Sequence, residues 1–173
     1  RGTGDLEIIA DSQESFGQRR LLRGHVEVRF DDTVLTADEI DFNELTHEIE
    51  ARGNVHYRNT LRQEDWYAER FSYNSHTELG TLYDVHGTVG SASQGGVRLL
   101  TTDNPFYIKG KVVHKTGKHY TVHGGFITNC NIDDPWWTLR APRTKISPGE
   151  SATIYRGVFR LRKVPVFYFP ILK

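Results

Sequence analysis

Residues 23–55 read RGHVEVRFDDTVLTADEIDFNELTHEIEARGNV, and this stretch decides the fold. Near its start, Val26, Val28 and Phe30 alternate with polar residues. Alternation with a period of two over six residues is typical of a β-strand with one buried face. The stretch therefore predicts a half-buried strand. Elsewhere in the chain no segment shows a convincing helical period, so the sequence predicts an all-β fold.

A second strand is predicted after the turn that follows this one. Leu35 and Ala37 share one face of it, whereas Ile40 and Phe42 share a face in the opposite register. A change of parity inside a strand requires an extra residue or a sharp bend. We therefore expect a bulge or corner near residues 38–39.

The same unit recurs along the chain. Residues 23–26 match residues 52–55, and residues 37–43 match residues 68–74, with Gly87 opening a third Gly-X-Val. Units that bury one face only by stacking on their neighbours are typical of repeat architectures. The sequence predicts repeated strands joined by turns of varying length.

Asn43 and Asn74 end the two units, where a residue that tolerates left-handed backbone geometry suits a turn. The stretch at residues 91–96 (SASQGG) predicts a loop. Further strands are predicted at residues 107–113, 120–128, 136–146 and 152–159, followed by the apolar run 164–171. Because Pro165 and Pro170 cannot donate to a ladder, that last run is not a central strand.

Small alanines fall on the inward faces, at Ala37, Ala51, Ala68 and Ala141. Two explanations are open. The alanines make room for large neighbours such as Phe42, Tyr73 and Trp66 in an ordinary packed core, or they leave a groove for an apolar guest.

Composition and charge bound the class of protein. The 173 residues suit one domain, spanning residues 1–173, and the mean hydropathy of −0.54 with 12% aromatic residues fits a sheet with one wet face. Residues 1–90 hold 9 Lys/Arg against 18 Asp/Glu, and residues 136–173 hold 8 against 1. The formal net charge is zero, but the N-terminal half is acidic and the C-terminal segment is basic. Nucleic acid is not expected as a partner, because the basic residues lack a helix or a stacking platform.

No constellation for catalysis or metal binding is evident. His119 and His123 are four residues apart, which in a strand separates them by roughly 13 Å. Asp133-Asp134-Pro135 reads as a turn, and Cys130, the single cysteine, has no recognisable base beside it. We expect no enzyme activity, no metal and no cofactor, and hence a binding or structural module.

Two motifs carry a family resemblance. The pattern Ala-Asp-X-Ile at residues 37–40 with Ala-X-Gly-Asn-Val at residues 51–55 resembles the OstA-like domain of lipopolysaccharide transport proteins. The segments at residues 126–139 (FITNC…PWWTL) and 164–170 (VPVFYFP) resemble the outer-membrane translocon of that family, just before its β-barrel. The chain is similar to the periplasmic N-terminal domain of that translocon.

The resemblance implies a fold and a function. The fold would be all-β, an open V-shaped β-jellyroll built as a stacked antiparallel β-roll. The domain would lie at the periplasmic face of the outer membrane, bind lipid A acyl chains of lipopolysaccharide in an apolar groove, and receive them from a periplasmic bridge protein joined by β-strand addition. Residues from about 160 to 173 would lead into the chain's own C-terminal β-barrel, which encloses a plug lipoprotein.

On this resemblance the inward positions would line the groove. Cys130 matches a cysteine that joins domain and barrel by a disulfide in other family members, although a second, N-terminal cysteine of some members is absent. The expected groove residues are Val28, Phe30, Leu35, Ile40, Phe42, Ile49, Val55, Tyr57, Phe71, Tyr73, Tyr120, Val122 and Phe126.

Three other functions remain open from the sequence. The first is the soluble periplasmic bridge protein of the same fold, which the proline-rich apolar tail disfavours. The second is a structural β-roll or docking module that binds no lipid. The third is a carbohydrate-processing jellyroll enzyme, which would need paired carboxylates that are not evident.

Overall fold

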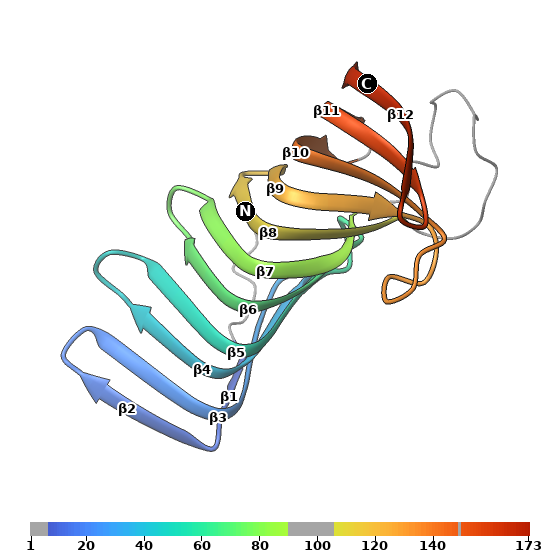
Figure 1. Ribbon diagram of the computed structural model, residues 1–173. Helices are drawn as coiled ribbons and strands as arrows, with labels where there is room; N and C mark the ends of the chain where they lie inside the picture. Colours follow the sequence, from blue (N-terminus) through green and yellow to red (C-terminus); the bar gives the residue numbers. More distant parts are fainter. Residues whose placement is uncertain (1–6, 90–105, 149) are drawn as a thin grey trace.

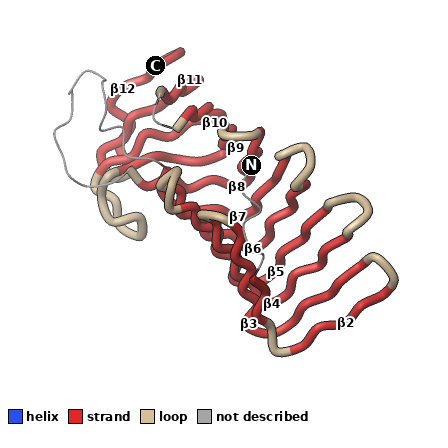
Figure 2. Tube along the Cα trace, turned by 180° about the vertical axis from the view of Figure 1, so that it is seen from behind, coloured by secondary structure: helices blue, strands red, loops and turns tan. Residues whose placement is uncertain are grey.

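The computed structural model describes residues 7–89, 106–148 and 150–173, and within them it is all-β (Figures 1 and 2). No described residue is helical, so no helix there could cross a bilayer. The expected open β-jellyroll is confirmed. The loop predicted at residues 91–96 lies outside the described residues.

Twelve strands follow one another along the chain. They are β1 (Glu7–Ile9), β2 (Ser12–Phe16), β3 (Arg19–Phe30), β4 (Thr33–Asn43), β5 (Glu48–Asn59), β6 (Glu64–Asn74), β7 (Leu79–Val89), β8 (Tyr107–Thr116), β9 (His119–Thr128), β10 (Trp137–Ser147), β11 (Ser151–Leu161) and β12 (Val164–Leu172).

All strands belong to one antiparallel sheet in which each strand from β3 to β12 pairs with the next. At the N-terminal end, β1 and β2 pair with successive halves of β3. At the other end β12 pairs only with β11, and the register shifts opposite Pro165. The prediction that residues 164–171 are not a central strand is confirmed. Within the described residues the sheet does not close into a barrel, and its edges are β1 with β2 at one end and β12 at the other.

Glycine-led bulges bend the sheet midway along its strands. On β3, Gly24 and His25 both have positive φ, and on β5, Gly53 and Asn54 do so. Each pair lies opposite a single residue of the neighbouring strand, and both pairs flank Asp38 of β4. A two-against-one pairing of this kind kinks the strand that carries it. The corner expected near residues 38–39 is confirmed, with the extra residues supplied by the strands on either side.

An aspartate sits over each bulge. A Cβ added to Gly53 would meet Oδ2 of Asp38 at 2.4 Å, and that oxygen accepts a 2.9 Å hydrogen bond from Nδ2 of Asn54. At the sheet edge, Asp11 occupies the same place over Gly24, with its Oδ2 at 2.8 Å from Nδ1 of His25. Glycine is required at both positions for two reasons. It adopts the left-handed backbone at little cost, and it has no Cβ that would collide with the carboxylate.

The third Gly-X-Val is not a third bulge. Gly87 pairs in register with Trp66 and has no positive φ. A Cβ there would meet the carbonyl oxygen of Asp65 at 2.1 Å, so this glycine permits a close approach of two backbones. On β7 the left-handed residue is Asp84, three positions earlier.

The two asparagines end their repeats as expected, but by a different mechanism. Oδ1 of Asn43 accepts hydrogen bonds from the backbone N–H groups two and three residues on, and Asn74 does the same. The left-handed residues of these turns are His47 and Glu78. Asparagine therefore contributes its side-chain oxygen, as in an Asx turn, and not a left-handed backbone.

The bend divides the sheet into two walls that face each other. We call the first wall residues 26–37, 55–68, 85–89, 107–110 and 125–128, and the second wall residues 19–23, 39–52, 70–83, 112–116 and 119–123. The side chains between the walls form the core, which includes Leu22, Val26, Ile40, Ala51, Trp66, Leu82 and Val113. All four inward alanines named above are buried.

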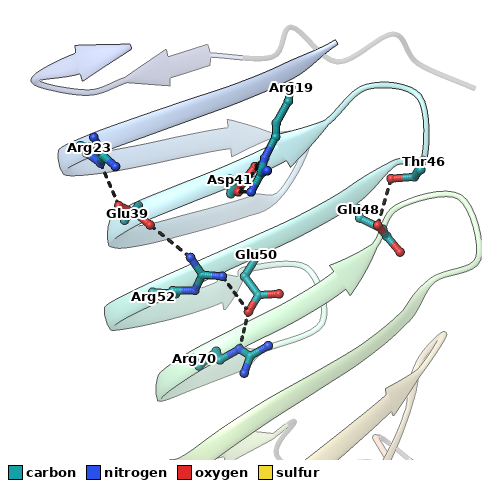
Figure 3. A network of polar contacts seen from close by, with 9 residues as sticks. All are labelled: Arg19, Arg23, Glu39, Asp41, Thr46, Glu48, Glu50, Arg52 and Arg70. Atoms are coloured by element: carbon teal, nitrogen blue, oxygen red, sulfur yellow. Dashed lines mark hydrogen bonds and ion pairs between the residues drawn. The ribbon is translucent and has the colours of Figure 1, made fainter. Parts of the chain in front are cut away.

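The outer face of the N-terminal strands carries a ladder of ion pairs, drawn in Figure 3. Glu39 lies between Arg23 and Arg52, at 2.9 and 3.2 Å, and Glu50 lies between Arg52 and Arg70. Hydrogen bonds from arginines lower the pKa of both Glu39 and Asp41, most strongly those from Arg23 and Arg19. Acidic and basic residues on this face therefore largely neutralise one another.

Candidate lipid groove

A cavity of about 280 Å³ lies between the two walls, near the turns at their free ends. Apolar side chains reach it from both walls, among them Leu35 and Tyr57 from the first and Ile49 and Phe71 from the second. The lining also has polar and charged residues, which are Asp31, Asp32, Thr33, Asn59, Arg62, Glu78 and Lys115. The cavity thus combines apolar side chains from both walls with polar and charged groups, as an amphiphile requires.

The structure brings six of the thirteen expected groove residues together in this cavity. The six that line it are Phe30, Leu35, Ile49, Tyr57, Phe71 and Tyr73. A further six belong to the same inner faces, where Ile40, Val55, Tyr120 and Val122 are buried and Val28 and Phe42 are half-buried. Twelve of the thirteen positions therefore share one interior, although half of them lie beyond the cavity itself.

Phe126 is the exception, and its expected face is wrong. It pairs with exposed Lys109 and Arg140, while the next residue, Ile127, packs against the core. The cause is Gly124, whose φ of +61° breaks the alternation begun by Tyr120 and Val122. Phe126 consequently lies on the outer face and lines a different hollow.

Next to the cavity, which Lys115 also lines, aromatic and charged side chains close the interior. The ring of Trp66 on the first wall lies 5.3 Å from that of Tyr120 on the second, and both are almost fully buried. Beside them, Nζ of Lys115 is 4.0 Å from Oε2 of Glu64 and donates to the hydroxyl of Tyr120 at 3.0 Å. These contacts join the two walls, so the interior is filled at this level.

The surroundings of this buried cluster change how its members ionise. Burial raises the pKa of both Tyr57 and Tyr120 well above the ordinary value, and the carboxylate of Glu64 raises it further. Burial lowers the pKa of Lys115, against the pull of Glu64. At neutral pH both phenols are therefore neutral and able to donate hydrogen bonds.

Sequence reasoning missed Glu64 and Lys115, although a signal for each exists. Lys115 is two residues from buried Val113, and Glu64 is two residues from buried Trp66. Extending the alternation by one more step would have placed both side chains inside. Their charge argued against burial. Inside, Lys115 donates to the Gly117 carbonyl and the Tyr120 hydroxyl. Oε2 of Glu64 accepts from the Tyr57 hydroxyl at 3.4 Å, whereas Oε1 of Glu64 is buried without a hydrogen-bond partner among the described residues.

The two ends of the sheet differ in what they expose. All five residues of β2 are exposed, and they are polar except for Phe16. On β12 the exposed residues include Val164, Phe167 and Ile171. An open edge of either kind can accept a further strand, and the apolar one also offers side chains to a partner.

Cys130 lies in the connection between β9 and β10 and is a half-buried free thiol. Its backbone N–H donates to Oγ1 of Thr128 at 3.1 Å. No group of three or more His, Cys, Asp or Glu side chains able to hold a metal ion occurs within the three described segments.

Comparisons with known proteins yield relatives that are named LPS-assembly protein LptD. The LPS-assembly protein LptD of Xanthomonas campestris pv. campestris (strain 8004) is 27% identical over 153 residues, covering 87% of this chain and 17% of the relative. That of Xanthomonas oryzae pv. oryzae (strain MAFF 311018) is 26% identical over 152 residues. That of Shewanella sp. (strain MR-4) is 24% identical over 172 residues, covering 96% of this chain and 20% of the relative.

No family model matches the chain. The chain spans about a fifth of the length of the relatives named above. The resemblance seen in the sequence is confirmed by these comparisons: over 87–96% of its length, this chain is similar to a segment of the LPS-assembly proteins LptD.

Proposed function

We propose that this chain is the periplasmic N-terminal domain of a lipopolysaccharide-assembly translocon and has no catalytic role. It holds lipid A acyl chains between its two walls and passes them from a periplasmic bridge protein to an outer-membrane barrel. The observation that carries the proposal is the similarity to LPS-assembly proteins LptD over 87–96% of the chain. The bent open sheet with an apolar interior supports it.

The cavity is suited to the end of an acyl chain. The apolar side chains of its lining can bury methylenes at roughly 0.8 kcal/mol each, without any specific hydrogen bond. A volume of about 280 Å³ is at the lower limit for small-ligand pockets, so a lipid with several chains requires the walls to separate. The Glu64–Lys115 and Trp66–Tyr120 contacts are where that separation would take place.

The open edges would serve the hand-over of lipid. The exposed edge formed by β1 and β2 would accept the terminal strands of the bridge protein and extend the walls without a break. The apolar edge strand β12 would lie nearest the barrel and its plug lipoprotein, which matches the expected role of residues 160–173. A disulfide from Cys130 to a cysteine elsewhere in the translocon stays a prediction.

An aspartate substitution on either face of the sheet tests the proposal. Ile49→Asp places a charge in the cavity, whereas Val34→Asp places the same charge on the outer face, and both positions are half-buried. We expect Ile49→Asp to weaken binding of fluorescent lipopolysaccharide by about tenfold or more, because a bound acyl chain would complete the burial of Ile49 and full burial of an isoleucine is worth about 1.5–3 kcal/mol. Val34→Asp should bind as the unsubstituted chain does, with thermal unfolding confirming that both variants fold. Equal losses would contradict the groove.

A structural docking module is the second candidate. The filled interior around Trp66 and Tyr120 favours it, because packed walls need no lipid. The same binding experiment separates the two functions. A chain that folds normally and binds no lipopolysaccharide would be a docking module.

A further inference from the structure

A second hollow, of about 640 Å³, lies on the outer face of strands β7–β11. Its lining includes three glycines of neighbouring strands, Gly110, Gly124 and Gly125. A Cβ added to Gly125 would meet the carbonyl oxygen of Lys109 at 2.0 Å, so the backbones of β8 and β9 approach closely here. Its volume is well within the range of small-ligand sites.

Four exposed cations line this hollow: Lys109, Lys111, Arg140 and Arg156. Among the residues that the structure describes, none of the four forms an ion pair, and the one acidic side chain of the lining is Asp84. The outer face of the N-terminal strands is different, because each arginine of its ladder contacts a carboxylate. Counted over the described residues, the lining of the hollow therefore has an excess of positive charge.

The cations are held in position by the sheet. His86, Lys109, Phe126, Arg140 and Val158 form one row across five strands. The Arg140 guanidinium lies 5.0 Å from the centroid of the Phe126 ring, and the Lys111 stem lies 3.5 Å from a Cβ built on Gly124. Neighbouring strands are about 4.8 Å apart, so Lys109 and Arg140 stand on either side of Phe126 at a separation that one ligand can bridge.

We infer that this hollow binds phosphate groups, carried by a soluble phosphate compound or by a lipid headgroup. A phosphate offers several charged acceptor oxygens, and arginine and lysine side chains are its usual partners in proteins. Phe126 and Val158 add an apolar surface for the carbon skeleton that bears the phosphate. The hollow shares no lining residue with the cavity between the walls, so the inference does not depend on the lipid groove.

Binding of two probes to the whole chain tests the inference. The first is inorganic pyrophosphate, measured by titration calorimetry at low salt, and the second is vesicles of phosphatidylcholine with and without phosphatidylglycerol. We expect saturable binding to at least one probe, weakened about tenfold or more in the Lys109→Gln/Arg140→Gln variant by the loss of two charge-assisted contacts. Pyrophosphate binding would identify a soluble ligand, and binding only to phosphatidylglycerol vesicles would identify a headgroup.

The matched control removes two cations from the ion-pair ladder. Arg52→Gln/Arg70→Gln lowers the net charge by the same amount on a part of the outer face where carboxylates already neutralise the arginines. This variant should keep binding, with circular dichroism showing that both variants fold. The inference is overturned if the unsubstituted chain binds neither probe, or if the control loses as much affinity as the Lys109/Arg140 variant.

Discussion

At the scale of single residues, the bend of the sheet depends on glycines with left-handed backbones beneath aspartates. Gly53 has a φ of +71° and lies under the carboxylate of Asp38. Gly17 has a similar φ of +62°, but a Cβ added there would meet nothing within 4 Å. The two glycines therefore separate the cost of backbone strain from the cost of displacing a neighbour.

We expect Gly53→Ala to destabilise the chain more than Gly17→Ala. The left-handed backbone alone costs a residue with a side chain about 1–2 kcal/mol. At position 53 the new methyl group also displaces Asp38 and disrupts its hydrogen bond from Asn54, at a further cost of about 0.5–1.5 kcal/mol. Urea unfolding measures both variants. Equal losses would show that displacing Asp38 adds no measurable cost to the backbone strain.

The buried phenols predict how stability changes in alkali. In the unfolded chain a tyrosine ionises near pH 10, whereas burial raises the pKa of Tyr57 and Tyr120 in the folded chain. Above about pH 10 the unfolded state therefore binds fewer protons, and the free energy of unfolding falls as pH rises. Lys115 has the opposite effect. Because burial lowers its pKa in the folded chain, the free energy of unfolding rises with pH between the folded and the unfolded pKa of this lysine.

Tyr120→Phe should reduce this alkaline loss of stability, because the variant has one phenol fewer to ionise on unfolding. Tyr67→Phe is the control, since Tyr67 lies exposed on the outer face of the sheet. Urea unfolding between pH 9 and 11.5 gives the slope for each protein. If Tyr120→Phe keeps the slope of the unsubstituted chain, that phenol does not resist ionisation as its burial implies.

At the scale of the elements, the sequence predicts the alternation of inward and outward side chains along the strands. It predicts only some of the places where that alternation is interrupted. The reversal between Ala37 and Ile40 predicted the corner because apolar residues stand on both sides of it. At Gly124 the same kind of reversal went unnoticed, because Phe126 and Ile127 are both apolar and either could face inward. Gly87 matched the repeat motif, but its role depends on the backbone of β6, which sequence does not show.

The edges of the sheet should be its least protected elements. Strands β2 and β12 each pair on one side only, and nearly all of their side chains are exposed. Strands β4 to β6 pair on both sides and contribute to the core. We expect amide hydrogens of β2 and β12 to exchange well before those of β5 in a hydrogen-exchange experiment. Protection of β12 comparable to that of β5 would mean that a partner covers this edge.

At the scale of the whole molecule, the open bent sheet followed from the sequence and the extent of its interior did not. The inward alanines allowed either a packed core or a groove, and the structure contains both. Trp66 and Tyr120 fill one level, while a cavity remains beside Leu35 and Tyr73. The choice depends on how far the two walls approach, which is set by contacts between residues distant in sequence, such as Glu64 and Lys115.

The central claim is that lipopolysaccharide enters between the walls, and photo-crosslinking tests it most directly. A photoreactive phenylalanine analogue would replace Tyr73, which lines the cavity, or Tyr67, which lies on the opposite face of the same strand. The account predicts adducts with purified lipopolysaccharide at position 73 and none at position 67. No adduct at position 73 in a folded chain, or equal adducts at both positions, would contradict it.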